Sequence, residues 1–435
     1  MPTLWSRLAK QAVGWAVWPR LPGGPTPSPS RKREGDKYMA TTQPDRIATL
    51  DVIRGVAVMG ILVANLPAFG LPEAAYFNPR AFGGAGPGDV ALWAANFVLV
   101  EGKMRGLFSF LFGASALLVI ERAGEAAARV HFGRMGWLFA IGLVHAYLIW
   151  WGDILAHYAL VGSIAFFLRG LSVRRLLLAG GLLVGAQCVL FALLGLAAFL
   201  PQSAPMAAAF GQPPAAEVAR ELAAYRGGYA ANVAYRWAMN DNPLVFVLAM
   251  GWETLGYMLW GMAGLKSGFL TGGWERGRYL RLAAWTLPVG LGVYAALAAT
   301  VIGRDFDWRY VALASMGVSA PVRPLVIIGY ASLAVLLARP GGVVTDRIAA
   351  AGRAAFTNYL GTSVLMTAIF YGWGLGLFGR IGRAEMYGLV PLAWALMLCW
   401  SKPWLDRYRY GPLEWVWRSL SRLELQPLRL GRPTK

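Results

Sequence analysis

The sequence predicts an all-α protein, a polytopic transmembrane helical bundle of about ten spanning helices plus one short interfacial or re-entrant helix. Composition is the first indication: 57% of the 435 residues are hydrophobic and 14% are charged, whereas soluble domains carry about 25% charged residues. The mean hydropathy of +0.48 agrees with this. The third indication is the length of the apolar runs, because a helix needs roughly 20 residues to cross a bilayer.

Ten apolar runs are predicted to span, five on each side of a long connection. This division predicts a first membrane half at residues 45–200, an extracytoplasmic loop at 201–242 and a second membrane half at 243–421. The predicted spans are Val52–Gly70, Arg105–Ile120, Arg134–Trp151, Asp153–Leu168, Leu176–Leu200, Pro243–Gly264, Leu282–Ile302, Pro324–Ala338, Ala354–Gly376 and Tyr387–Trp400.

Two segments between these runs have a different character. Val90–Val100 is apolar but too short to span easily, and Glu101, Gly102 and Lys103 separate it from the next run. We expect it to lie at the interface or to re-enter the membrane. The 201–242 loop holds a helical pattern after two proline-containing stretches. It is long enough to lie over the outer mouth as a lid or an interfacial helix, and a passive linker fits it equally well.

Basic residues predict the orientation, because positive charge collects in cytoplasmic loops. With the amino terminus inside, an even number of spans places both termini in the cytoplasm. The net charge of +19 then reflects this asymmetry and attraction to anionic lipid headgroups. No nucleic-acid partner is expected. The cytoplasmic basic residues are Arg122, Arg129, Arg134, Arg169, Arg174, Arg175, Lys266, Arg276, Arg278, Arg281, Arg339, Arg347, Arg353, Lys402, Arg407, Arg409, Arg418 and Arg422.

The chain's two ends differ from its membrane halves. Residues 1–44 include the run PGGPTPSPSRKR, which cannot build a core, so we expect a disordered amino-terminal extension. Met39 opens a more ordinary start, which suggests that residues 1–38 are an over-called gene start. Residues 422–435 are predicted to form a cytoplasmic tail.

The stretch Gly142–Tyr158, GLVHAYLIWWGDILAHY, places two histidines and an aspartate in apolar sequence. Ionisable groups at membrane depth are costly and usually mark function. Asp153 and His157 are four residues apart, so they share one helix face. His145 and His157 should lie roughly 7–10 Å below the outer turn of one hairpin. We predict His145 as general base, Asp153 as its orienting carboxylate and His157 as substitute or supporting partner. The alternative is a polar cluster that joins two helices.

Five further polar residues are candidates for substrate or donor binding. Glu253 lies mid-helix, where a carboxylate is either paired or protonated, and it should partner an arginine or line a cavity. Asp51 and Arg54 can form an i,i+3 ion pair, and Arg54 could alternatively hold a donor phosphate. Asn358 opens the ninth span, where packing or capping is the simpler role. Asn65 is the fifth candidate, and a family resemblance indicates it.

Five motifs in order resemble the YeiB-like family of bacterial inner-membrane proteins, whose function is unknown. The resemblance covers approximately Arg46–Ser421, nearly the whole chain. The motifs are TLDVIRGVAVMGILVAN (Thr49–Asn65), EGKMRGLFSFLFGAS (Glu101–Ser115), GLVHAYLIWWGDILAHYALVG (Gly142–Gly162), AAGRAAFTNYLGTS (Ala350–Ser363) and RYRYGPLEWVWRSL (Arg407–Leu420).

The opening motif is also similar to the first helix of the heparan glucosaminide acetyltransferases and, more distantly, to acyltransferases that modify bacterial glycans. This similarity implies a transmembrane acyl-transfer fold with an acyl-CoA donor inside and a glycan, lipid-linked or small acceptor outside. Asn65 falls where those enzymes have a functional asparagine. Their catalytic histidine follows in the next loop, and Leu66–Asp89 contains no histidine here.

Two classes of function therefore remain. The first is a membrane acyltransferase, and the second is a proton-coupled transporter or permease in which Glu253, Asp153 and the histidines bind substrate or relay protons. No P-loop, HExxH zinc site, GxSxG elbow or dinucleotide fingerprint is present in the sequence. We expect no metal site, and no cofactor is implied beyond acyl-CoA as a donor substrate.

Overall fold

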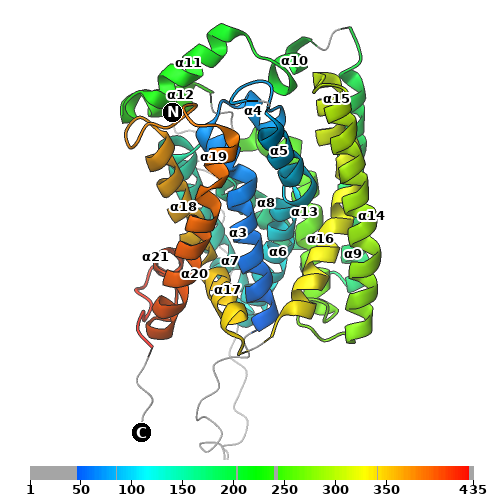
Figure 1. Cartoon of the computed structure of the whole chain (residues 1–435). Helices are drawn as coiled ribbons and strands as arrows, with labels where there is room; N and C mark the ends of the chain where they lie inside the picture. The colour runs from blue at the N-terminus through cyan, green and yellow to red at the C-terminus, as the bar shows by residue number, and fades with distance from the viewer. Residues whose placement is uncertain (1–46, 85, 202–203, 240–242, 340, 431–435) are drawn as a thin grey trace, which may run out of the picture. The chain divides into compact units, whose positions relative to one another are not determined.

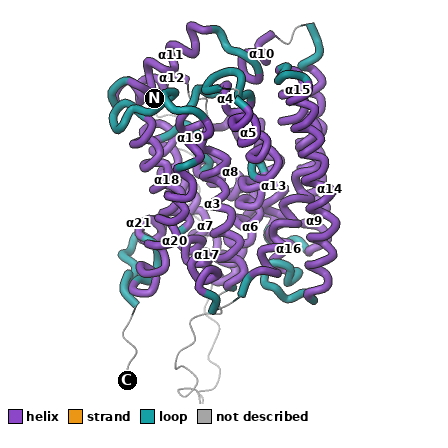
Figure 2. The backbone as a smooth tube through the Cα atoms, in the orientation of Figure 1, coloured by secondary structure: helices purple, strands orange, loops and turns teal. Residues whose placement is uncertain are grey.

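The chain folds into helices joined by loops, and no strand occurs among the residues that the structure describes. The structure is a computed structural model, and it describes residues 47–84, 86–201, 204–239, 243–339 and 341–430. The predicted extension at residues 1–44 lies outside these ranges. The helices run along one direction and most loops gather at the two ends of the bundle (Figure 2). The all-α prediction is confirmed.

Each of the ten predicted spans contains a helix. Several helices begin earlier or end later than predicted, because polar residues at their ends continue the helical backbone. The helices are α3 Ala48–Gly70, α4 Ala74–Phe77, α5 Pro87–Leu99, α6 Lys103–Ala123, α7 Ala127–Val144, α8 Leu155–Leu168, α9 Val173–Ala197, α10 Ala204–Phe210, α11 Ala215–Arg226, α12 Tyr229–Met239, α13 Pro243–Lys266, α14 Arg276–Gly303, α15 Trp308–Ala312, α16 Ser319–Leu337, α17 Val343–Arg353, α18 Ala355–Phe370, α19 Arg383–Tyr387, α20 Leu389–Arg407 and α21 Pro412–Arg422.

Seven helical stretches of the described chain are long and apolar enough to cross a membrane, and one of them, residues 87–149, comprises α5, α6 and α7. Two outward-facing helices, α9 and α14, expose large apolar side chains. Leu182, Leu193 and Trp285 are 76%, 61% and 74% exposed. Such a surface suits hydrocarbon rather than water. The chain is a polytopic α-helical membrane protein.

Close helix contacts in the bundle depend on glycine. A Cβ atom at Gly261 of α13 would lie 1.7 Å from the carbonyl oxygen of Phe110 on α6. A Cβ atom at Gly113 of α6 would lie 2.0 Å from the carbonyl oxygen of Met258. Small residues allow membrane helices to approach in this way. The contact fixes α13, which carries Glu253, against α6.

The bundle has two distinct ends. The upper end in Figure 1 carries α4, α10, α11 and α12, and the lower end carries α17 and α21. The 201–242 connection is helical at the upper end, where it forms α10, α11 and α12. It is therefore not an extended linker over its described residues. We use "upper" and "lower" for these two ends throughout.

The turn between α7 and α8 differs from the prediction. Helix α7 passes into a π-helical turn at His145–Ile149, the residues 150–154 are not helical, and α8 begins only at Leu155. The α8 helix has 14 residues and so rises about 21 Å, less than the roughly 30 Å hydrocarbon core. The turn is therefore recessed inside the bundle. Trp150 is buried there, stacked on Phe69 with ring centroids 4.0 Å apart.

The predicted span Pro324–Ala338 also starts too late. The helical backbone is continuous from Trp308 through a π-helical turn at Leu313–Val318 to Leu337. Small apolar residues before Arg323 extend the helix, and Pro324 is accommodated inside it. Arg323, one residue before the predicted span, is consequently buried within the observed helix.

Candidate functional site

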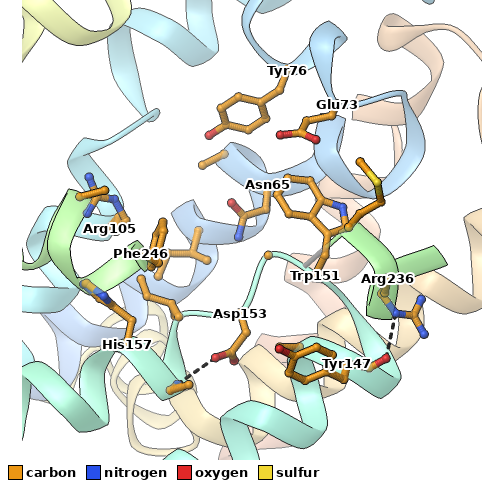
Figure 3. A pocket seen from close by; sticks show the side chains of 18 of the residues that line it. Asn65, Glu73, Tyr76, Arg105, Tyr147, Trp151, Asp153, His157, Arg236 and Phe246 are labelled. Atoms are coloured by element: carbon orange, nitrogen blue, oxygen red, sulfur yellow. Dashed lines mark hydrogen bonds between the residues drawn. The ribbon is translucent and has the colours of Figure 1, made fainter. Parts of the chain in front are cut away.

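Two cavities enter the bundle. The upper cavity has a volume of about 460 Å³ and lies beneath α11 and α12. The lower cavity has a volume of about 220 Å³ and lies above α21. The upper cavity is lined by Ile61, Ala64, Asn65, Glu73, Tyr76, Glu101, Gly102, Arg105, Ala146, Tyr147, Trp151, Gly152, Asp153, Ile154, Ala156, His157, Glu221, Tyr225, Tyr235, Arg236, Met239, Val245, Phe246, Ala249 and Tyr359. Figure 3 shows this cavity from close by.

Asp153 joins the recessed turn to the start of α8. Its Oδ2 accepts a hydrogen bond from the backbone N–H of Ala156 at 2.8 Å, which caps the first turn of that helix. Its Oδ1 lies 2.8 Å from Nδ1 of His145. A carboxylate only accepts, so His145 donates from Nδ1. The predicted neighbours Asp153 and His145 thus lie in contact.

The predicted pairing of Asp153 with His157 on one helix face is wrong. Asp153 precedes α8, because the backbone at residues 150–154 is not helical. Asp153 and His157 both line the upper cavity, whereas His145 does not. The His145 ring is 1% exposed and packs 5.3 Å from the Tyr359 ring. The order in space is the reverse of the predicted one: the carboxylate lies at the cavity wall and the histidine behind it.

His157 has a defined hydrogen-bonding state. Its Nε2 lies 2.9 Å from Oγ1 of Thr254, and that hydroxyl donates to the carbonyl oxygen of Met250 at 3.1 Å. The hydroxyl hydrogen is thereby engaged, so Nε2 of His157 carries a proton and donates it. Nδ1 of His157 has no hydrogen-bond partner among the described residues. In the neutral ring, Nδ1 is an unprotonated nitrogen that is itself buried in this conformation, although His157 lines the cavity.

Glu253 is held by two arginines rather than standing alone in the membrane. Its Oε2 accepts from Nη2 of Arg105 at 2.8 Å, and its Oε1 accepts from Nη1 of Arg323 at 2.6 Å. The Tyr257 hydroxyl donates to Oε1 at 2.8 Å. Glu253 does not line the upper cavity, but Arg105 does. The carboxylate therefore fixes a guanidinium group at the cavity wall.

Of the remaining predicted residues, Asp51 and Arg54 form the predicted ion pair, and Asn65 and Asn358 lie elsewhere. Asn65 lines the upper cavity. Arg54 lines the lower cavity, 3.2 Å from Oδ1 of Asp51, and donates to Oγ of Ser115 at 2.8 Å. Asn358 lines neither cavity.

The side chain of Asn358 has structural partners. Its amide donates to the carbonyl oxygen of Ala351 at 3.0 Å and to Oγ of Ser401 at 3.2 Å. The indole N–H of Trp400 donates to its Oδ1 at 2.9 Å. These bonds tie α18 to α17 and α20. Asn358 lines neither of the two cavities, so the structure does not support its predicted role in binding.

The lower cavity has a basic rim around an apolar interior. Four arginines line it with His131, and Glu414 is the one carboxylate among its lining residues. Glu414 accepts from the backbone N–H groups of Phe356 and Thr357, at 2.8 and 3.1 Å, so it caps α18. The arginines are Arg54, Arg134, Arg353 and Arg418.

Several wall residues were not singled out from the sequence. Arg236 of α12 is 1% exposed and donates to the carbonyl oxygens of Tyr147 and Leu148, at 3.2 and 3.0 Å. It thereby bonds α12 to the recessed turn. Glu221 of α11 accepts from the backbone N–H of Glu73 at 3.1 Å and closes the cavity from above. The sequence signal that could have identified Arg236 and Glu221 is that both are charged residues in the helical part of the 201–242 loop.

Comparison with known proteins gives the family. The chain is 34% identical over 388 residues to the uncharacterized protein YeiB of Escherichia coli strain K12, covering 87% of this chain and 96% of that protein. It is 29% identical over 412 residues to the uncharacterized protein YxaH of Bacillus subtilis strain 168, covering 90% of this chain and 98% of that protein. The chain belongs to the YeiB-like family.

The YeiB-like assignment agrees with a second comparison. Residues 265–424 match the family model described as a protein of unknown function (DUF418). That range holds α14 to α21, and with them Tyr359 of the upper cavity and Arg353 and Arg418 of the lower one. No solved structure matches the chain.

Proposed function

We propose that this YeiB-like protein is a membrane acyltransferase of the bacterial inner membrane, moving an acyl group from acyl-CoA to an acceptor on the far side. One observation carries the proposal. A cavity with an arginine rim and an apolar interior enters from one end, and a cavity with histidine, carboxylate and aromatic walls enters from the other. The two chemistries suit the two substrates of such a transfer.

The lower cavity suits the donor. Guanidinium groups bind phosphates through paired hydrogen bonds, and four of them line this cavity. Its apolar interior fits a short acyl chain. The basic residues of this end also favour a cytoplasmic location for it, with both termini inside. Acyl-CoA is present in the cytoplasm, so donor and site then lie on one side.

The upper cavity suits an extracytoplasmic acceptor with hydroxyl or amine groups. Aromatic rings such as Tyr76, Trp151 and Tyr235 line it together with the carboxylates of Glu73 and Asp153. Such walls combine an apolar face with hydrogen-bond acceptors, which matches a sugar or another polyol. A glycan, free or lipid-linked, is the acceptor class that we propose.

The reaction that these residues can support is a direct transfer. Nδ1 of His157 accepts the proton of an acceptor hydroxyl, and the oxygen attacks the thioester carbonyl carbon. The N–H groups of Arg105 and Asn65 stabilise the negative charge that develops on the carbonyl oxygen. The carbon–sulfur bond then breaks, and the proton passes from His157 to the departing CoA thiolate.

The test is transfer by the purified protein in lipid nanodiscs, with radiolabelled acetyl-CoA and an envelope fraction as acceptor. We expect CoA release and labelled acceptor, and a loss of about 10²-fold or more for His157→Gln. Thr254→Val should lower the rate less, because it removes only the bond that fixes the ring. Ser163→Ala is the matched control, since Ser163 lies on α8 but lines neither cavity.

A second function is favoured by the same pair of cavities. Two cavities that enter from opposite ends are also typical of a transporter that alternates its access. A proton-coupled transporter would move a polar solute into proteoliposomes only under a proton gradient. CoA release without any gradient would support the acyltransferase. Gradient-driven uptake of the solute without CoA release would contradict the acyltransferase and support the transporter.

A further inference from the structure

Three side chains separate the two cavities. Ile61, Ile154 and Tyr359 line the upper cavity and also the lower cavity. They come from different parts of the fold: Ile61 from α3, Ile154 from the recessed turn and Tyr359 from α18. We use "septum" for these three residues. The two cavities therefore share part of their walls at this point.

Tyr359 is the one residue of the septum with a polar side-chain group, and the hydrogen bond of that group is long. Its hydroxyl donates to the carbonyl oxygen of Gly152 at 3.4 Å, at the long limit of a hydrogen bond. A small cavity of about 10 Å³ lies against the ring and against Ile61. Ile61 and Ile154 have no polar group to hold them. The Tyr359 side chain is 6% exposed and packs in the core, so its ring changes rotamer only when neighbouring side chains move with it.

The position of the septum relates it to the reactive groups. The Tyr359 ring lies 5.3 Å from the ring of His145, and Gly152, which accepts from its hydroxyl, directly precedes Asp153. Asn65 lines the small cavity beside Tyr359 as well as the upper cavity. A group that passed from the lower to the upper cavity would emerge beside Asp153 and Asn65.

We propose that the septum is the crossing point between the two sides of the membrane, closed in this conformation, and that the Tyr359 ring limits the size of the group that crosses. This inference rests on the proposed acyltransferase for what crosses. The acyl carbon of a donor in the lower cavity reaches an acceptor in the upper cavity only when the ring swings aside. Chain length is then selected here, because each added methylene needs more of the space that Tyr359 occupies.

The first arm of the test needs no acyl transfer. In a background of Cys188→Ser and Cys399→Ser, which removes both cysteines of the chain, Ala64→Cys reports on the upper cavity and Ala116→Cys on the lower one. A charged methanethiosulfonate is added to right-side-out or inside-out vesicles. We expect each cysteine to react from one side only, and Tyr359→Ala with Ile61→Ala to make both react from either side.

Tyr359→Phe is the matched control for this arm, because it keeps the ring and removes only the hydroxyl. Reaction should remain one-sided in this variant. Reaction of Ala64→Cys from both sides in the parent would overturn the septum, and so would one-sided reaction after the double truncation.

The second arm measures acyl selectivity with purified protein. Tyr359→Ala should raise the rate with butyryl-CoA relative to acetyl-CoA by about tenfold, while Tyr359→Phe leaves the ratio unchanged. An unchanged ratio in Tyr359→Ala contradicts the size limit. If the cysteines behave as expected but no variant transfers an acyl group, the septum stands and the proposed acyltransferase fails. The two conclusions are thereby separable.

Discussion

At the scale of single residues, the ion group around Glu253 joins three helices. Arg105 belongs to α6, Glu253 to α13 and Arg323 to α16. Both Glu253 and Arg323 are almost fully buried, at 2% and 3% exposure. Each charge lost hydration when the bundle formed, and the opposite charges, with the Tyr257 hydroxyl, offset that cost. The group is one unit, and removing its carboxylate leaves two like charges facing each other.

Glu253→Gln should therefore destabilise the protein strongly. The glutamine keeps the shape and removes the charge, so the cost should be about 3–5 kcal/mol. The measurement is thermal unfolding in detergent, with fluorescence size exclusion as readout. Arg309→Gln, which breaks an exposed pair with Asp307, should change stability by about 0.5 kcal/mol or less. An unfolding temperature of Glu253→Gln equal to that of the parent would contradict this account.

At the scale of elements, apolar runs predicted helices well and their interruptions poorly. The run that became α3, Ala48–Gly70, was located to within a few residues of its ends. The recessed turn was not located from the sequence. Its carbonyl groups that make no helical hydrogen bond accept instead from side chains distant in sequence. Tyr229 and Arg236 of α12 both donate to the carbonyl oxygen of Leu148. The sequence around the turn does not predict these partners.

The candidate site, like the helices, was predicted only in part from the sequence. Residue types at membrane depth identified Asp153, His157 and Glu253 as unusual, since buried ionisable groups are rare in apolar sequence. Their partners depended on tertiary contacts. Thr254 follows Glu253 directly, yet one bonds His157 and the other bonds Arg105 and Arg323. The sequence predicted the contact of His145 with Asp153 and an arginine partner for Glu253, and it did not predict the contact of His157 with Thr254.

Helix α11 should respond to pH through Glu221. Burial and the neighbouring Glu73 carboxylate raise the pKa of Glu221 from 4.5 to about 7, against the opposing effect of the hydrogen bond from the Glu73 backbone N–H. The folded position therefore favours the protonated acid. Its stabilising contribution is full below about pH 4.5 and is lost as the pH rises to about 7. Tyr225 and Tyr235, which also face Glu221, have pKa values raised by burial and stay neutral in this range.

Hydrogen exchange of α11, corrected for the intrinsic effect of pH, measures this. Protection should fall between pH 4.5 and 7 in the parent, and Glu221→Gln should keep the protection nearly constant. Glu217→Gln, at an exposed position of the same helix, should follow the parent. A parent-like decrease in Glu221→Gln would show that another group controls the helix.

At the scale of the whole molecule, charge and cavities are arranged along one axis. The lower cavity is lined by four arginines and one carboxylate, while the upper cavity is lined by two arginines and four carboxylates. A donor with several phosphates is attracted to the lower cavity and repelled from the upper one. The net charge of +19 strengthens this attraction from a distance. Orientation in the membrane and choice of donor thus have a common electrostatic origin.

This arrangement predicts a binding step that salt weakens. CoA itself, without an acyl group, should bind the purified protein. Arg134→Gln with Arg418→Gln should weaken its affinity at least about 10²-fold, because each charge-assisted contact contributes roughly 1.5–3 kcal/mol. Raising the salt concentration should weaken CoA binding to the parent more than to this double variant, since fewer charges then remain to be screened. Arg278→Gln, exposed on α14 and outside both cavities, makes the matched control and should bind like the parent. Isothermal titration at two salt concentrations measures these affinities. An equal loss of CoA affinity in Arg278→Gln and in the double variant would show that CoA responds only to the overall positive charge. The lower cavity would then not be its binding site.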